Sequence, residues 1–201
     1  MKKLILLLAL AGTLMAGHDD WVFDTLFTAK GDHVVSTGRD MTAKLTELAT
    51  QRFVDNLTSI TPGALKGGLS ALARHPQRDE FLVGGADGVP QVYRVFREVD
   101  RKIGDNSNLS RRFPAMEGRV FAVSYRADGK RVLAASSLDG KGAVNVYRAE
   151  YDPKLPDNIK AVFSKTSTER NAAENAAVEA YQTEGTERLA RTELPTGIYA
   201  A

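Results

Sequence analysis

Residues 17–48 read GHDDWVFDTLFTAKGDHVVSTGRDMTAKLTEL, and this stretch decides the fold that the sequence predicts. Two turn-forming groups, at 31–32 and 38–40, separate three short apolar runs at 21–27, 34–36 and 43–48. Short apolar runs that are joined by Gly and Asp turns are typical of an antiparallel meander. The stretch therefore predicts three consecutive strands of one small antiparallel sheet.

The punctuation of this stretch resembles the WD-repeat family. A WD-repeat blade begins with a Gly-His pair and closes near a Trp-Asp pair, and here Gly17-His18 opens the stretch while Asp40 occupies the turn before the third strand. Thr46-Glu47 stands at the place of the Trp-Asp pair. The resemblance implies a four-stranded blade of a β-propeller.

In that family a His, a Ser or Thr, the turn Asp and the Trp form a buried hydrogen-bonded chain that locks the blade. The resemblance implies the same role for His18, Ser36 and Asp40, with Thr46 at the Trp position. Ser, His and Asp also make up a hydrolytic triad. Because Ser36 is expected in mid-strand rather than on an exposed nucleophile elbow, we interpret the three residues as structural.

Two further copies of the pattern follow the first. Asp87 lies in the turn of the second copy and Tyr93 at its Trp position, and Asp139 and Tyr147 take these places in the third copy. We therefore include these four residues among the blade-locking residues. The strands expected for the two copies are 69–73, 80–85 and 89–95, and then 119–125, 131–137 and 143–147.

The predicted fold is all-β, a partial WD-repeat β-propeller of about three four-stranded antiparallel blades with a helical insertion near the C-terminus. After residue 151 prolines interrupt the strand pattern and alanines recur at roughly helical spacing, which indicates the insertion. The expected parts are blades at 17–58, 59–113 and 114–151, the helical insertion at 152–191, and the start of a truncated further blade at 192–201.

The first sixteen residues have the form of a secretory signal peptide. Met1-Lys2-Lys3 is a basic start, 4–15 is an apolar run, and Ala16 is a small residue at a plausible cleavage point. The run is short for a transmembrane helix, which needs about 20 apolar residues. The sequence therefore predicts a periplasmic or secreted protein without stable membrane insertion. An amphiphilic inner strand or an uncleaved anchor stays open as the alternative.

Composition excludes several classes of function. The 201 residues are 43% hydrophobic and 26% charged, with a net charge of +2, and the basic residues are scattered, which argues against nucleic-acid binding. The absence of cysteine excludes disulfides, thiolate metal sites and a CxxCH haem attachment. The three histidines have no metal-ligand spacing, and the Asp-Gly-Lys turns at 128–130 and 139–141 lack the ligand pattern of a calcium loop. We expect no cofactor, no metal and no catalysis.

Longer segments resemble one group of bacterial exported proteins, in which a c-type cytochrome domain precedes a WD-repeat propeller. The segments are TQRFVDNLTSITPGALKGG (50–68), ARHPQRDEFLVGGADGVPQVYRVFRE (73–98) and FAVSYRADGKRVLAASSLDGKGAVNVYRAEYDPKLP (121–156). The repeat itself and the absence of a credible catalytic set favour a non-catalytic scaffold for protein–protein interaction, with an unknown protein partner. We expect the chain to be a fragment of a larger exported propeller protein that can self-associate through open blade edges. Two alternatives stay open: an accessory module of a periplasmic c-type cytochrome redox assembly, and an enzyme with a site in the central channel.

Overall fold

The structure is a computed structural model, and it describes residues 17–59, 67–102 and 106–199. These residues form three four-stranded antiparallel sheets and two α-helices. The prediction of a mostly β fold with a helical insertion near the C-terminus is therefore confirmed. The predicted signal peptide, 1–16, lies outside the described residues.

Each sheet is built from strands that follow one another in the sequence. The first sheet consists of β1 (Val22–Phe27), β2 (His33–Gly38), β3 (Ala43–Glu47) and β4 (Phe53–Asn56). The second consists of β5 (Leu69–Arg74), β6 (Glu80–Gly85), β7 (Gln91–Arg94) and β8 (Leu109–Arg112). The third consists of β9 (Arg119–Tyr125), β10 (Arg131–Leu138), β11 (Lys141–Arg148) and β12 (Arg188–Leu194).

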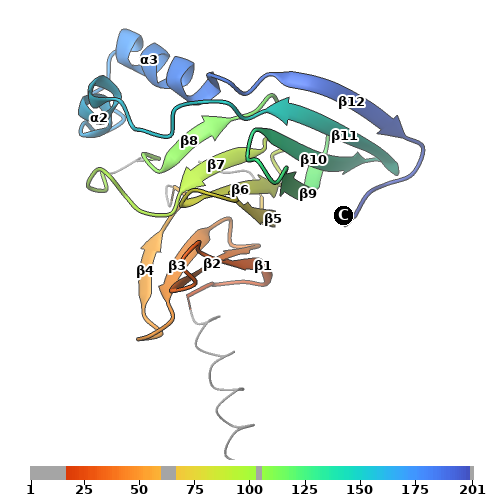
Figure 1. Cartoon of the computed structure of the whole chain (residues 1–201), viewed down its shortest axis with the longest axis horizontal. Helices are drawn as coiled ribbons and strands as arrows, with labels where there is room; N and C mark the ends of the chain where they lie inside the picture. Colours follow the sequence, from red (N-terminus) through yellow and green to blue (C-terminus); the bar gives the residue numbers. More distant parts are fainter. Residues whose placement is uncertain (1–16, 60–66, 103–105, 200–201) are drawn as a thin grey trace, which may run out of the picture.

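The three sheets stack with their first strands together, so that β5 lies between β1 and β9 (Figure 1). Two hydrogen bonds tie these strands: Leu72 N donates to Asp24 Oδ2 at 2.8 Å, and Ser70 Oγ donates to Val120 O at 2.8 Å. One apolar core fills the space between the first and second sheets, and another fills the space between the second and third. The second sheet is therefore covered on both faces.

The turn between β2 and β3 and the turn between β6 and β7 have the same hydrogen-bond pattern. Thr42 N donates to Asp40 Oδ1 at 3.2 Å, and Val89 N donates to Asp87 Oδ1 at 3.1 Å. The residue after each Asp has a positive φ, 66° at Met41 and 74° at the glycine of the second turn. The two turns thus repeat in geometry as well as in sequence.

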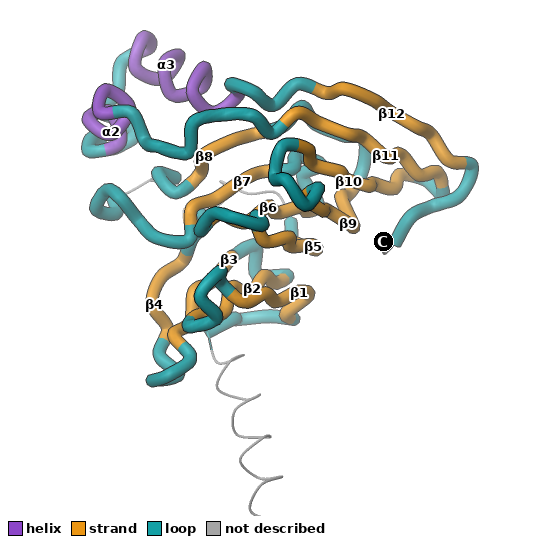
Figure 2. The backbone as a smooth tube through the Cα atoms, in the orientation of Figure 1, coloured by secondary structure: helices purple, strands orange, loops and turns teal. Residues whose placement is uncertain are grey.

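The two helices form the connection between β11 and β12, and they pack outside the second sheet. They are α2 (Asp157–Phe163) and α3 (Ala172–Thr183), and α3 lies along β8 (Figure 2). Asn171 begins α3 with a capping box, since its side chain accepts from Glu174 N while the Glu174 side chain accepts from Asn171 N. Their own small core contains Val99, Leu155, Ile159, Phe163 and Tyr181.

The end of the chain differs from the sequence prediction. The helical insertion was expected to extend to residue 191 and a further blade to begin at 192, whereas Arg188–Leu194 forms β12, the outer strand of the third sheet. β12 pairs with β11, for example Thr192 with Val144. Because β12 is charged and exposed along its length, its strand conformation comes from this pairing rather than from local propensity.

Candidate functional site

The residues predicted to lock the first blade lie together. Nδ1 of His18 is 2.9 Å from Oδ2 of Asp40, and Nε2 of His18 is 2.8 Å from Oγ of Ser36. Because a carboxylate only accepts hydrogen bonds, Nδ1 carries the proton and Nε2 accepts from the Ser36 hydroxyl. The side chains of His18 and Asp40 are 1% and 7% exposed. The cluster joins the segment before β1 to the turn between β2 and β3.

The cluster continues through Thr42 rather than through Thr46. Thr42 Oγ1 donates to Asp40 Oδ1 at 2.9 Å, and Asp19 N donates to Asp40 Oδ2 at 3.1 Å. Burial alone would raise the pKa of Asp40, but the hydrogen bonds from His18, Asp19 and Thr42 hold it below its ordinary value. Ser36 is buried in β2, whereas a nucleophilic serine must meet its substrate. The geometry therefore favours the structural role.

In the second sheet the two predicted residues are linked through one that sequence reasoning missed. The Tyr93 hydroxyl donates to Gln91 Oε1 at 2.6 Å, and Gln91 Nε2 lies 3.5 Å from Asp87 Oδ2. Burial raises the pKa of both Asp87 and Tyr93. The turn Asp and the residue at the Trp position therefore belong to one buried polar chain.

In the third sheet the two predicted residues lie apart. Tyr147 is buried, accepts from Asn145 Nδ2 at 2.8 Å and donates to Pro114 O at 2.9 Å. Asp139 is exposed at the tip of the β10–β11 hairpin with φ 49°. Asp139 therefore does not have the buried position that the predicted locking role requires. The pairing of β10 with β11 runs up to Leu138 and Lys141, which leaves Asp139 in the two-residue turn at the tip.

A buried polar residue recurs two positions before each predicted Trp position. Lys44, Gln91 and Asn145 occupy this place, and each is at most 8% exposed. Their cross-strand partners are Ser36, Val83 and Ala134, so the three have the same place in the three sheets. Their spacing from Thr46, Tyr93 and Tyr147 is visible in the sequence and could have identified them.

The helices are held against the second sheet by a buried arginine. Arg111 is 1% exposed, and its guanidinium carbon lies 4.2 Å from the ring centroid of Tyr151 and 4.3 Å from that of Tyr181. Its Nη2 donates to Asp152 O at 3.2 Å. A desolvated guanidinium between two aromatic rings is a strong cation–π arrangement. Arg111 therefore connects β8, the segment after β11, and α3.

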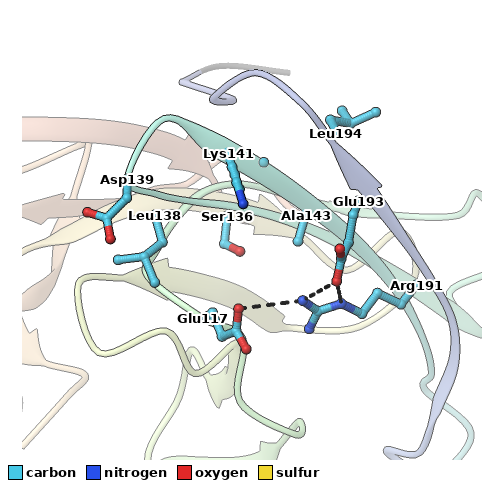
Figure 3. Close-up of a pocket in the computed structure, with 10 residues that line it drawn as sticks. Glu117, Ser136, Leu138, Asp139, Lys141, Ala143, Arg191, Glu193 and Leu194 are labelled. Carbon is cyan, nitrogen blue, oxygen red and sulfur yellow. Dashed lines mark hydrogen bonds and ion pairs between the residues drawn. The ribbon is translucent and has the colours of Figure 1, made fainter.

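A pocket of about 330 Å³ opens between the β10–β11 hairpin, the end of β12 and the loop before β9 (Figure 3). Arg191 lies between two carboxylates in this pocket. Its Nε and Nη2 donate to Glu193 Oε1 at 3.1 and 2.9 Å. Its Nη2 also lies 3.6 Å from Glu117 Oε2. Ser136, Asp139 and Lys141 also line it. Charged groups of both signs therefore surround a space large enough for one side chain of a partner.

No metal site and no membrane-spanning helix are found within the described ranges. Among these residues no group of three or more His, Cys, Asp or Glu could hold a metal ion. No helix in this part of the chain has both the length and the apolar composition to cross a membrane. No protein-family model matches the chain, and no curated protein matches it.

Proposed function

We propose that the chain is a segment of a WD-repeat β-propeller and acts as a non-catalytic scaffold for a protein partner in the periplasm or outside the cell. The family assignment is supported by the His18–Asp40–Ser36 cluster and by the turn that recurs at Asp40 and Asp87. Propeller blades bury their faces against neighbouring blades. Among the described residues the first and third sheets each have a neighbouring sheet on one face only, which is what a segment of a larger exported propeller would show.

One observation carries the proposal of a binding scaffold: the large exposed apolar side chains gather on the first and third sheets. Among the described residues, six belong to the first sheet and the residues next to its strands, five to the third sheet and the segment after it, and one, Phe96, to the second. They are Trp21, Phe23, Phe27, Met41, Phe53 and Val54, and then Leu133, Leu138, Leu189, Leu194 and Tyr199. Exposed apolar surface of this kind marks interaction sites.

Photo-crosslinking in an exporting bacterial host tests this function. A photoreactive phenylalanine at Phe27 or Leu133 should give one saturable adduct with a protein of constant mass. The same residue at Phe96 is the matched control, because Phe96 is 41% exposed but follows β7 of the doubly covered second sheet. Adducts of equal yield at all three positions, or no adduct at any of them, would contradict the scaffold.

A further inference from the structure

The pocket beside β12 has more negative than positive charge. Glu117, Asp139 and Glu193 provide three carboxylates, and Lys141 and Arg191 provide two cations. The Arg191 guanidinium is already engaged, since Glu193 accepts two of its N–H groups and Glu117 forms an ion pair with it. Glu117 and Glu193, whose side chains are 74% and 73% exposed, line the pocket and are open to solvent. The pocket is therefore better suited to a cation than to an anion.

A buried hydroxyl without a partner lies in the wall of the same pocket. Ser136 is 0% exposed, and its Oγ has no hydrogen-bond partner among the described residues. Ser136 pairs with Ala143 across β10 and β11, and Ala143 pairs with Glu193 across β11 and β12. The three residues form one row across three strands, and all three line the pocket. A hydroxyl oxygen accepts hydrogen bonds, so Ser136 gives this wall of the pocket an acceptor that has no partner among the described residues.

We propose that this pocket binds the basic side chain of a lysine or arginine presented by the protein partner. An ammonium or guanidinium group has several donors and no acceptor, which suits the carboxylates of Glu117 and Glu193 together with the Ser136 hydroxyl. The apolar stem of such a side chain packs against Leu138 and Leu194, which also line the pocket. This inference rests on the proposed function, because it names the chemistry of the partner.

The test uses small probes rather than the partner. N-acetyl-lysine methylamide and N-acetyl-arginine methylamide are titrated into the isotope-labelled chain, and amide chemical shifts are followed. The uncharged analogues, from norleucine and citrulline, are the ligand controls. We expect saturable shifts at Ser136, Ala143 and Glu193 with a charged probe, and binding at least tenfold weaker with its analogue.

Variants distinguish this pocket from general charge attraction. Glu193→Gln and Glu117→Gln should each weaken binding of the better charged probe at least threefold, and Ser136→Ala should do so without any change in charge. Glu179→Gln removes the same charge from α3 and should leave binding unchanged, since Glu179 is 69% exposed and pairs with Arg112 outside the pocket. Using both glutamate variants keeps the test valid if one of them fails to fold.

Two results would overturn the inference: equal binding of the charged and uncharged probes, or equal loss of binding in Glu179→Gln and the pocket variants. Either result leaves the scaffold intact if adducts still form at Phe27 or Leu133. If the charged probes bind as expected but the chain forms no such adduct, the scaffold proposal is rejected and the cation site is retained. The failures of the two proposals are therefore separable.

Discussion

Nδ1 of His18 donates to the carboxylate of Asp40 across 2.9 Å, and this bond ties the segment before β1 to the β2–β3 turn. The residues are 22 positions apart in the chain. The contact therefore holds the segment before β1 against the end of the first sheet at which β1 begins. Asp40 also accepts from Asp19 N and from Thr42. Loss of this one carboxylate would leave donors from three residues without their acceptor.

The first prediction concerns the stability of this cluster. His18→Ala and Asp40→Ala should each lower the free energy of unfolding by about 1–3 kcal/mol, because each substitution leaves a buried partner unsatisfied. The double variant should lose less than the sum of the two, since both remove the same hydrogen bond. Denaturant unfolding of the two single variants and the double variant measures this coupling. Additive losses, or two neutral variants, would contradict the locking role.

The second prediction concerns His75, whose titration couples stability to pH. Its Nδ1 accepts from Gln77 N and Arg78 N, both at 3.1 Å. Burial first, and then the charge of Arg78, lowers the pKa of His75 from its ordinary value of 6.5 to about 4. Between these pH values the unfolded chain binds more protons than the folded chain, so the free energy of unfolding should fall as the pH falls from 6.5 to 4.

The matched variant for this pH dependence is His75→Asn. The asparagine keeps an oxygen that can accept from the two backbone N–H groups, but it does not titrate. Unfolding measured at several pH values should give a flatter profile for the variant than for the parent chain. Parallel profiles over this interval would mean that His75 is protonated equally in the folded and unfolded states.

The third prediction concerns the attachment of the helices. Tyr181→Ala should destabilise this region by about 3–5 kcal/mol, because a buried aromatic ring is lost and Arg111 loses one of its two aromatic partners. Hydrogen exchange should show faster exchange of the α3 amides and unchanged protection in β10. Tyr199→Ala is the control, since Tyr199 is 69% exposed. Equal effects of the two variants on α3 would refute the role of Arg111.

The first three strands of each sheet, and the turns between them, could be predicted because their signals are local. Gly and Asp turns separate apolar runs at short range, and the turn Asp recurs at Asp40, Asp87 and Asp139. β12 could not be predicted in this way, because its strand conformation depends on an edge of β11 that is distant in sequence. The same holds for Arg111, whose burial requires Tyr181 of a helix that lies 70 residues further along the chain (181 − 111).

The fourth prediction concerns export. Because the basic start, the apolar run and Ala16 have the form of a secretory signal, we expect the chain to lose its first sixteen residues in a secreting host. Intact-mass spectrometry of the exported protein should give a mature N-terminus at or near Gly17. Full-length protein recovered from the cytoplasm would contradict the periplasmic or secreted location.

The fifth prediction concerns the open sheet faces. Leu133 is 36% exposed and pairs with Val146 on the third sheet, which has a covering sheet on one face only among the described residues. Exposed apolar faces and free strand edges favour association. We therefore expect the isolated chain to self-associate at micromolar concentration. Leu133→Lys should shift it toward the monomer, and Phe96→Lys should not.

The central claim is that the three sheets are stacked blades whose outer faces need further blades or a partner. The most direct test combines light scattering with thermal melting. It compares two proteins: this chain, and the same chain extended by further blades to a closed ring. The account predicts a self-associating or weakly cooperative short chain and a monodisperse, cooperatively melting closed ring. A short chain that is a monodisperse monomer and melts cooperatively would contradict the account.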